Sequence, residues 1–256
     1  MQVVILCGGL GTRLAEETDV RPKPMVEVGG KPLLWHIMKL YSHHGFTDFI
    51  LCLGYKGDLI REYFLNYHAM HSDVLVHLGE NRVEHLDSFH DEAGWTVLLA
   101  ETGLETHTGG RLRRVAHYLE GDRFLMTYGD GVSNVDLIKL IAFHEVHGKL
   151  ATVTGVHPLA RFGELRVDGD MVREFREKPQ LEAGWMNGGF FVLERRALEY
   201  ITEDTPFERQ PLERLAREGQ LAVYRHDGYW RAMDTLREKR MLEEEWASGH
   251  PAWKVW

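Results

Sequence analysis

Short apolar runs alternate with amphipathic stretches along the first part of the chain. Residues 3–7 and 49–53 are mainly apolar and lack regular polar alternation, which is typical of strands buried on both faces of a sheet, and residues 74–78 are predicted to form a third strand. Residues 31–44 and 58–64 carry apolar side chains at helical spacing. Because strands and helices alternate, the pattern predicts an α/β fold, with a Rossmann-like, mostly parallel sheet flanked by helices.

The same alternation returns in the middle of the chain. A glycine-rich entrance at residues 108–110 leads into a predicted helix with apolar residues on one face as far as residue 119. A strand is predicted over 124–127, a helix over 136–147 and a strand over 151–156. We therefore expect residues 1–156 to form the main part of the sheet and its helices.

Beyond residue 156 the chain becomes richer in predicted strands. Residues 164–167 and 172–175 alternate around Asp168-Gly169-Asp170, which is a strong hairpin signal. Residues 187–193 form a glycine-rich strand pattern. The remaining predicted elements are a strand over 221–225 and helices over 196–201, 211–217 and 235–248. Since no long linker separates this β-rich portion, 157–256, from the rest, we expect one domain over 1–256.

One long segment, residues 79–107, breaks the alternation. It is polar and rich in His and acidic residues, apart from a strand-like run over 96–100. It also carries Leu86, Phe89 and Trp95, and such a mixture of aromatic and polar residues is common at protein interfaces. An interface and a solvated insertion that covers the sheet edge are equally good interpretations.

Composition restricts the function. The net charge of −9 over 256 residues argues against a protein that binds nucleic acid, and no apolar stretch approaches the about 20 residues of a membrane helix. Cys7 and Cys52 lie within apolar runs and are expected to be buried free thiols in a reducing compartment. The start of the chain does not resemble a signal peptide. These features predict a soluble cytoplasmic protein.

The loop after the first predicted strand carries the clearest chemistry. Gly8, Gly9 and Gly11 allow the backbone to turn tightly and to present N–H groups to an anion. Arg13 adds a fork of donors that suits phosphate oxygens, and Lys23 adds an ammonium group on a proline-rich segment. Since ligands bind at the carboxyl edge of parallel sheets, this pattern predicts a phosphate site with two cations.

Two common phosphate loops do not fit this segment. A P-loop requires GxxxxGK[ST], and here Arg13 and Leu14 stand where Gly and Lys belong. A dinucleotide fingerprint requires GxGxxG, and Leu14 occupies the place of its third glycine. A plain turn would explain the glycines but not the two cations.

Five further residues stand at predicted strand or helix ends. Thr108, Gly110 and Arg111 open a helix whose N–H groups suit a base or phosphate, although a helix start with a surface arginine explains the spacing nearly as well. Asp130 follows a strand and suits a divalent cation, while a turn aspartate is the simpler interpretation. Asp234 precedes the last helix and suits an N-cap.

The predicted β-rich portion offers a second set of polar groups. Glu177 and Lys178 leave the hairpin next to Pro179, where the lysine suits a sugar phosphate and the acid suits sugar hydroxyls. A surface ion pair is the alternative. Asn187 and Gly188 begin the glycine-rich strand, which indicates close approach of a ligand to the backbone.

These motifs together resemble a known family. GGLGTRL followed by RPKPMVEVGGKPLLWH resembles the signature of the sugar-1-phosphate nucleotidylyltransferases. TGGRLRRV, TYGDGV, RFGEL, REKP, NGGFFVL and MDTLREK resemble the branch that uses CTP and glucose 1-phosphate. The resemblance runs from Gly8 to about Lys239. It implies the nucleotide-diphospho-sugar transferase fold, Mg²⁺ as cofactor and a homo-oligomer, with a hexamer as one form.

The resemblance also implies roles for the residues above. It places Arg13 on the leaving pyrophosphate, Lys23 on the α-phosphate, and Asp130 with Asp234 on Mg²⁺. Residues 1–156 would bind the nucleotide and 157–256 the sugar phosphate. The nucleotide site would include Leu6, Cys7, Gly8, Gly9, Gly11, Thr12, Arg13, Thr108, Gly110, Arg111 and Gly129, and the sugar-phosphate site Glu177, Lys178, Asn187 and Gly188.

The expected reaction is transfer of a cytidylyl group from CTP to α-D-glucose 1-phosphate. No spacing in the sequence identifies the base, so the same chemistry with UTP, dTTP or another sugar 1-phosphate stays open. An inactive subunit of this fold that only senses nucleotide is the alternative of another class. Retention of both cations and both aspartates favours the enzyme.

Overall fold

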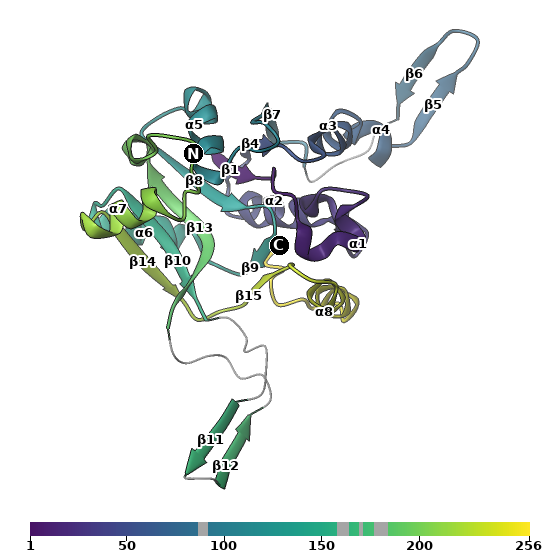
Figure 1. The fold of residues 1–256 in the computed structure, drawn as a ribbon. Coiled ribbons are helices and arrows are strands. Elements are labelled where there is room, and N and C mark those ends of the chain that lie inside the picture. Colours follow the sequence, from purple (N-terminus) through teal and green to yellow (C-terminus); the bar gives the residue numbers. More distant parts are fainter. Residues whose placement is uncertain (87–91, 158–163, 169–170, 177–183) are drawn as a thin grey trace.

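A seven-stranded mixed sheet forms the centre of the molecule (Figure 1). The computed structural model describes the chain except for residues 87–91, 158–163, 169–170 and 177–183. The strand order is β14-β10-β13-β8-β1-β4-β7. These strands are β1 (Val3–Leu6), β4 (Asp48–Leu53), β7 (Thr96–Glu101), β8 (Arg123–Tyr128), β10 (Ala151–Val156), β13 (Met186–Glu194) and β14 (Leu221–His226).

Most neighbouring strands run parallel, as the alternation of strands and helices predicts. β1 pairs in parallel with β4 and β8, β4 with β7, and β10 with β14. β13 is the exception, because it runs antiparallel to both β8 and β10. The predicted fold class is therefore confirmed, and strands from both portions of the chain share one sheet.

The central strands of the sheet are buried on both faces. Along β1, Val3 and Ile5 belong to one core cluster and Val4 and Leu6 to the other, as the twofold alternation of a strand requires. Helices α2, α3, α6 and α8 supply buried residues to the first cluster, and α5 and α7 to the second. Their bounds are α2 (Leu33–His43), α3 (Gly57–Leu65), α5 (Thr108–Val115), α6 (Leu137–His147), α7 (Gln210–Arg217) and α8 (Leu236–Ala247).

The helices begin and end close to the predicted bounds because their signals are local. The Asp136 carboxylate accepts a hydrogen bond from the Lys139 N–H at the start of α6, and Gly148 ends that helix with φ at 60°. Residues 196–201, predicted as a helix, lie within and beside a 3₁₀ helix. The remaining short elements are α1 (Ala15–Thr18), α4 (Tyr67–His71), β2 (Glu27–Val28), β3 (Lys31–Pro32) and the 3₁₀ helices η1 (Thr12–Leu14), η2 (Lys23–Met25), η3 (Ala116–Tyr118) and η4 (Arg195–Tyr200).

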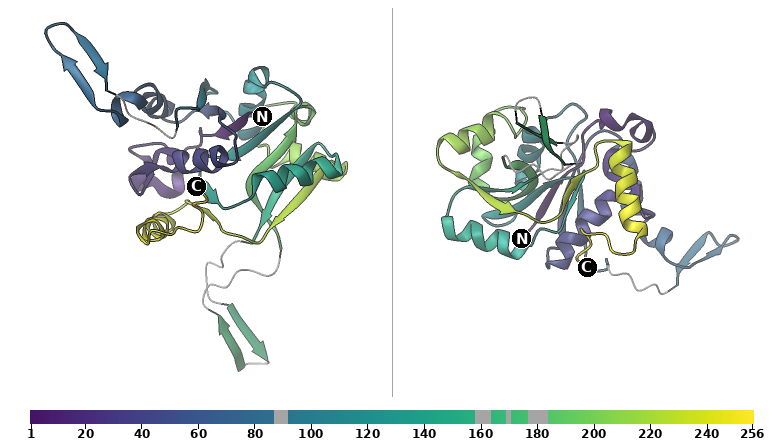
Figure 2. Two further views of the ribbon diagram at one scale, coloured as in Figure 1. Left: turned by 180° about the vertical axis from the view of Figure 1, so that it is seen from behind. Right: turned by 90° about the horizontal axis from the view of Figure 1, so that it is seen from below.

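The prediction of a strand near residues 74–78 is confirmed, but its expected place in the parallel sheet is wrong. Strand β5 (Val74–His77) instead pairs with β6 (Arg82–His85) in a separate antiparallel hairpin, which projects from the body of the molecule (Figure 2). The chain reverses through the turn between the strands, where Asn81 takes a φ of 49°. The place beside β4 goes to β7, which lies in the segment expected to be mostly irregular.

The predicted hairpin near residue 170 is confirmed, and a further strand pair was not expected. Strand β11 (Glu164–Asp168) pairs with β12 (Met171–Arg176). A short antiparallel pair joins β9 (Gly131–Ser133) to β15 (Trp230–Ala232), with Gly131 opposite Ala232. This pair connects positions about a hundred residues apart.

Two expectations from composition can be compared with the structure. Cys7 and Cys52 are both buried free cysteines, as expected. Burial raises the pKa of both thiols, so they stay protonated. Within the part of the chain that the structure describes, no helix has the length and apolar character needed to cross a bilayer.

Candidate active site

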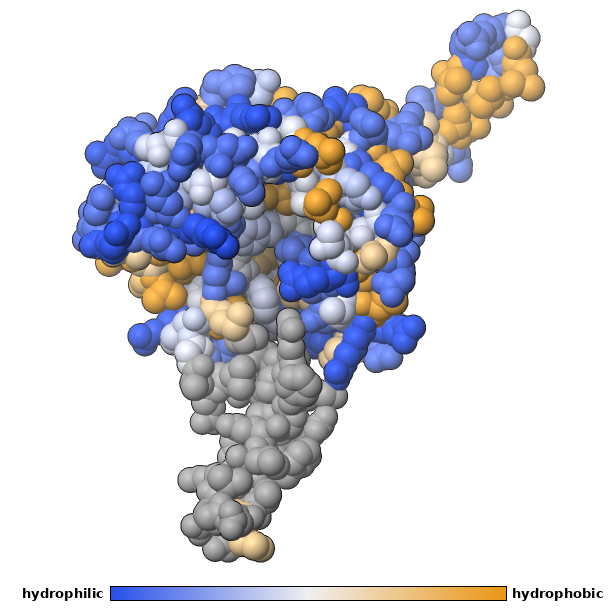
Figure 3. All heavy atoms as spheres, in the orientation of Figure 1, coloured by the Kyte–Doolittle hydropathy of each residue, from blue (hydrophilic) through white to orange (hydrophobic). Residues whose placement is uncertain are grey.

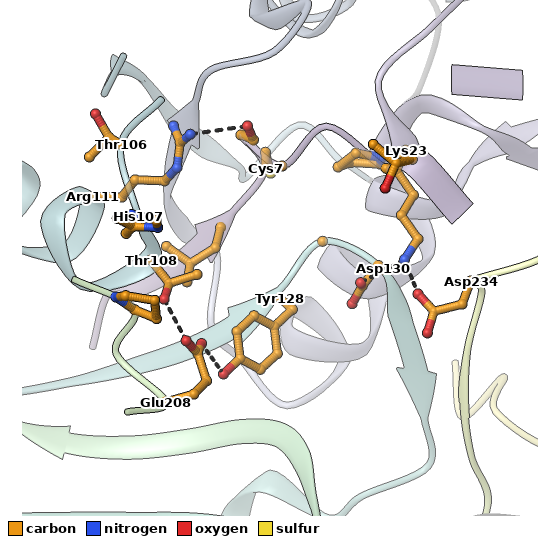
Figure 4. A pocket seen from close by; sticks show the side chains of 18 of the residues that line it. Cys7, Lys23, Thr106, His107, Thr108, Arg111, Tyr128, Asp130, Glu208 and Asp234 are labelled. Carbon is orange, nitrogen blue, oxygen red and sulfur yellow. Dashed lines mark hydrogen bonds and ion pairs between the residues drawn. The ribbon is translucent and has the colours of Figure 1, made fainter. Parts of the chain in front are cut away.

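A cavity of about 420 Å³ opens where β1 and β8 end (Figure 4). It therefore lies at the carboxyl edge of the parallel strands, the usual ligand position in such sheets. Its walls come from the glycine loop, the start of α5 and the segments around residues 130, 207 and 234. The lining residues are Leu6, Cys7, Gly8, Gly9, Gly11, Thr12, Arg13, Lys23, Pro24, Thr106, His107, Thr108, Arg111, Tyr128, Gly129, Asp130, Pro206, Glu208 and Asp234.

Asp130 and Asp234 lie together at one end of this cavity. Asp130 immediately precedes β9 and Asp234 follows two residues after β15, so the antiparallel pairing of these strands brings the two carboxylates to the same place. The Met233 N–H also donates to the Asp130 carbonyl at 2.8 Å. The β9–β15 pair is thus the structural cause of the two-aspartate site.

Lys23 joins the two aspartates. Its Nζ atom lies 2.8 Å from Asp130 Oδ2 and 2.5 Å from Asp234 Oδ1. Burial alone would lower the pKa of Lys23, but the two carboxylates outweigh it and raise the pKa above the usual value. The side chain therefore stays a charged ammonium group inside the cavity.

Arg13 adds a second cation to the same cluster. Its guanidinium lies 2.9 Å from Asp234 Oδ2, and two thirds of the side chain is exposed. Lys23, by contrast, is held in η2, which begins after Pro22 and includes Pro24. The rigid lysine and the exposed arginine give this end of the cavity one fixed and one adaptable positive charge.

The interpretation of Asp234 as a helix cap is wrong. The N-cap of α8 is Thr235, whose hydroxyl accepts from the Glu238 N–H. Glu238 Oε2 accepts in return from the N–H groups of Thr235 and Asp234. Because the capping box uses only the backbone of Asp234, its side chain is left for the cavity.

The carboxylates of Asp130 and Asp234 suit a hard divalent cation. The described residues contain no group of three His, Cys, Asp or Glu side chains with metal-ligand geometry. Mg²⁺ nevertheless is bound by one or two carboxylates when phosphate oxygens and water complete its shell. The donor set at this end of the cavity therefore fits a magnesium ion that arrives with a nucleotide.

The glycine loop is shaped by close contacts as well as by its turn. Gly11 has a φ of 65°, in the left-handed region. A Cβ atom on Gly8 would lie 2.1 Å from the Arg111 guanidinium, whereas one on Gly9 would meet nothing within 4 Å. A side chain on residue 8 would thus displace the Arg111 guanidinium from its present position, a contact that the sequence did not indicate.

Arg111 lines the cavity, but the N–H groups of its guanidinium donate to oxygen atoms of the protein. Its guanidinium donates to the carbonyls of Gly8, Leu53 and Leu104 and to the Thr102 hydroxyl, at 2.7 to 3.2 Å. Burial lowers its pKa from the usual value. Arg111 therefore ties the glycine loop to the ends of β4 and β7, and its predicted contact with nucleotide stays a prediction.

Two functional candidates, Glu208 and Tyr128, were missed by the sequence interpretation. Glu208 Oε1 accepts from the Tyr128 hydroxyl and Oε2 from the Thr108 hydroxyl, each at 2.6 Å (Figure 4). Tyr128 adjoins the Gly129-Asp130 motif at the end of a predicted strand, and this position could have marked it as a site residue. Glu208 follows a segment with no predicted helix or strand, so the sequence did not mark it.

The remaining predicted residues lie beside the cavity or outside the described chain. Asn187 donates to the Tyr128 hydroxyl at 3.3 Å, and the Gly188 carbonyl accepts from the Trp230 indole at 2.7 Å. Gly110 is buried at the start of α5. Glu177 and Lys178 lie outside the described residues. The structure thus brings together all four predicted catalytic residues and most of the predicted nucleotide site.

The family of the chain follows from comparison with known proteins. A family model described as nucleotidyl transferase matches residues 2–238. The chain belongs to the nucleotidyl transferase family. Family membership and enzyme class are therefore as the sequence motifs predicted.

The nucleotidyl transferase matches curated relatives over their full length. It is 52% identical to the glucose-1-phosphate cytidylyltransferase of Salmonella typhi and 44% identical to the probable glucose-1-phosphate cytidylyltransferase of Bacillus subtilis. Both alignments cover all of this chain and all of the relative. The likeness is thus not limited to the motifs of the cavity.

Solved structures confirm the fold of this nucleotidyl transferase. HddC from Yersinia pseudotuberculosis superposes with a TM-score of 0.70 at 25% identity, over 96% of this chain and 99% of that one. A putative glucose-1-phosphate thymidylyltransferase from Bacillus anthracis superposes with a TM-score of 0.67 at 18% identity, over 95% and 94% of the two chains. The second likeness concerns the fold alone.

Proposed function

We propose that this nucleotidyl transferase transfers the cytidylyl group of CTP to α-D-glucose 1-phosphate, which gives CDP-glucose and pyrophosphate. One observation carries the proposal. Lys23, Asp130 and Asp234 converge with Arg13 in one cavity, in a chain 52% identical over its full length to a glucose-1-phosphate cytidylyltransferase.

The chemistry requires positioning and charge rather than a general base. A phosphate oxygen of the sugar phosphate attacks the α-phosphorus of CTP, and the bond from that phosphorus to the oxygen of the β-phosphate breaks. The nucleophile is already an anion, so no proton has to be removed. Lys23 would stabilise charge that develops at the α-phosphate, and Arg13 would hold the leaving pyrophosphate.

Asp130 and Asp234 would hold Mg²⁺ in this reaction. A bound magnesium ion supplies positive charge that neutralises phosphate oxygens and orients the triphosphate. In the structure the Lys23 ammonium lies between the same two carboxylates. Lys23 would therefore transfer its contacts from the aspartates to the phosphates when the nucleotide and metal bind.

Other groups of the cavity would complete the two substrate sites. The N–H groups of the glycine loop and of the start of α5 suit phosphate and nucleoside oxygens. Asn187 and Gly188, with Glu177 and Lys178, remain the proposed contacts to the sugar phosphate.

Pyrophosphate release tests the proposal and its rivals. The purified protein would be assayed with CTP, UTP, dTTP and ATP, each with glucose 1-phosphate and several other sugar 1-phosphates, in the presence of Mg²⁺. We expect the highest kcat/KM for CTP with glucose 1-phosphate. Another preferred pair would replace the proposed substrates, and no turnover with any pair would favour the inactive nucleotide-sensing subunit. The cytoplasmic location expected from composition stays a prediction.

We further propose that the protein is a homo-oligomer, with a hexamer as one form, and that the β5–β6 arm, residues 74–86, contacts a second copy. The arm projects from the body and carries a concentration of apolar surface (Figure 3). The apolar residues of the arm that are at least 45% exposed are Leu75, Val76, Leu78, Val83 and Leu86. Such a surface away from the cavity is typical of an interface.

Light scattering tests the assembly. A mass near the 29.6 kDa of one chain at micromolar concentration would contradict it. Leu78→Asp should shift the protein to smaller species, because a charge would be buried in the contact. Val146→Asp is the matched control, since Val146 is 89% exposed and Leu78 90%. Deletion of residues 79–90 should act like Leu78→Asp, and an unchanged mass in both would place the interface elsewhere.

A further inference from the structure

Glu208 lies at the end of the cavity away from the two aspartates. In Figure 4 it stands with Tyr128 and Thr108 on one side, while Lys23, Asp130 and Asp234 lie on the other. The Glu208 side chain is partly exposed and lines the cavity. A carboxylate in this position is available to a bound substrate.

The hydrogen bonds around Glu208 fix the direction of its donors. The Thr108 hydroxyl accepts from the Phe207 N–H at 2.8 Å, so its only proton points to Glu208 Oε2. The Tyr128 hydroxyl accepts from the Asn187 amide at 3.3 Å and donates to Glu208 Oε1. Burial and the charge of Glu208 raise the pKa of Tyr128, which keeps this donor protonated. Glu208 therefore acts only as an acceptor.

A carboxylate with two donors retains capacity for more. Its two oxygens offer about four lone-pair sites, and the protein donors described above use two of them. The two protein hydroxyls also hold the carboxylate in one orientation, which reduces the entropy lost when a ligand donates to it. Glu208 is thus a preorganised acceptor on the cavity wall.

The carboxylate is not the only group that holds its own segment in place. The segment around Glu208 is tied to the start of α5 by three other hydrogen bonds: His107 N–H to Asp204 Oδ1, Gly109 N–H to the Thr205 carbonyl, and Phe207 N–H to the Thr108 hydroxyl. The bonds made by His107 and Gly109 involve neither Glu208 nor the Thr108 hydroxyl. The segment therefore has anchors of its own besides the two hydrogen bonds that Glu208 accepts.

Charge indicates which substrate groups Glu208 selects. The phosphates of both proposed substrates belong at the end with Lys23 and Arg13, and a carboxylate repels them. Hydroxyl groups, in contrast, donate to carboxylates strongly. Both the ribose of CTP and the ring of glucose 1-phosphate carry such hydroxyls.

We propose that Glu208 is a specificity-determining residue that accepts a hydrogen bond from a substrate hydroxyl group, either of the nucleotide ribose or of the sugar ring. Tyr128 is then a positioning residue, because it orients the carboxylate. The inference rests on the proposed function. Glu208 adds a hydrogen-bond acceptor between the two predicted substrate sites. It contacts Thr108 of the predicted nucleotide site directly, and Asn187 of the predicted sugar-phosphate site through Tyr128.

The proposal is tested by comparing kcat/KM of the unaltered protein and of a Glu208 variant with full and deoxy substrates, as in a double-mutant cycle. Glu208→Gln and the unaltered protein would each be assayed with CTP, 2′-deoxy-CTP and 3′-deoxy-CTP, and with glucose 1-phosphate and its 2-, 3-, 4- and 6-deoxy analogues. With the full substrates Glu208→Gln should lower kcat/KM by about 10- to 100-fold, the usual effect of losing a hydrogen bond to a charged group. With the analogue that lacks the partner hydroxyl, the same substitution should cost less than about 3-fold.

The identity of that analogue distinguishes the ribose from the sugar ring. An equal loss with every substrate would overturn the proposal, because it would show that Glu208 contacts no hydroxyl. So would an unchanged kcat/KM. If Glu208→Gln does not fold, as judged by circular dichroism, the same cycle with Glu208→Asp, whose carboxylate is withdrawn from the cavity, decides in the same way.

Two further variants separate this inference from general damage. Glu218→Gln is the matched control, since Glu218 accepts from the Tyr200 hydroxyl at 2.5 Å but lies outside the cavity, and its kinetics should be unchanged. Tyr128→Phe should reproduce a weaker form of the Glu208→Gln pattern. If the unaltered protein forms no nucleotide sugar, the proposed function fails. If it prefers another nucleotide, the cycle uses that nucleotide and its deoxy forms.

Discussion

Lys23 and Arg111 are two buried cations on the wall of one cavity, and their surroundings are opposite. Lys23 is 9% exposed and contacts two carboxylates, which raise its pKa. Arg111 is 4% exposed and contacts carbonyl and hydroxyl oxygens, and burial lowers its pKa. A cation paired with two carboxylates can give way to another cation at the same oxygens, whereas one paired with backbone carbonyls holds the loops together.

The largest effect is expected at the carboxylates around Lys23. Asp130→Asn and Asp234→Asn should each abolish Mg²⁺-dependent turnover, because an amide has no charge to hold the metal. Titration of pyrophosphate release with Mg²⁺ measures this, and thermal melting shows whether the fold is kept. Asp227→Asn serves as the control, since Asp227 is largely exposed. Full activity in Asp234→Asn would remove that residue from the metal site.

Replacement of Lys23 should lower mainly kcat. If its charge counts most in the transition state, Lys23→Ala should lower kcat by on the order of 10²-fold or more, while CTP binding weakens less. Lys139→Ala is the control, because Lys139 is 75% exposed and pairs only with Asp136 among the ion pairs of the described residues. An unchanged kcat in Lys23→Ala would exclude Lys23 from the chemistry.

Replacement of Arg111 should affect the stability of the fold more than the rate of the reaction. Arg111→Met leaves several buried oxygens without a donor, so the free energy of unfolding should fall by about 2 to 3 kcal/mol. The neighbouring Arg113 is exposed and donates to one carbonyl, so Arg113→Met should cost about 0.5 kcal/mol or less. Urea denaturation of both variants measures the difference. Equal losses would mean that Arg111 is not the link between the loops.

The smallest effect on stability is expected from a substitution in the glycine loop where it contacts Arg111. Gly8→Ala would place a Cβ atom 2.1 Å from the Arg111 guanidinium, which has to move. We expect a loss of about 1 to 2 kcal/mol in the free energy of unfolding. Gly9→Ala meets no atom within 4 Å and should stay within about 0.5 kcal/mol. The prediction would be contradicted if urea denaturation showed a larger loss in the free energy of unfolding for Gly9→Ala than for Gly8→Ala.

Much of the cavity could be predicted because its residues sit at recognisable ends of strands and helices. The glycine loop follows β1, Asp130 follows β8 and Thr108 begins α5, and a strand or helix end is visible in the local pattern. Glu208 lies in a segment without such a pattern. It reaches the cavity only because the chain folds back against α5.

The sequence by itself determined the buried strands, most helix bounds and the loop chemistry, because burial, periodicity and capping are properties of neighbouring residues. The tertiary structure decided which segments meet. It assigned the place beside β4 to β7 rather than β5, and through β9 and β15 it joined Asp130 to Asp234. It also turned Arg111 inward. Such pairings depend on the whole core, since many distant segments carry similar local patterns and only packing distinguishes them.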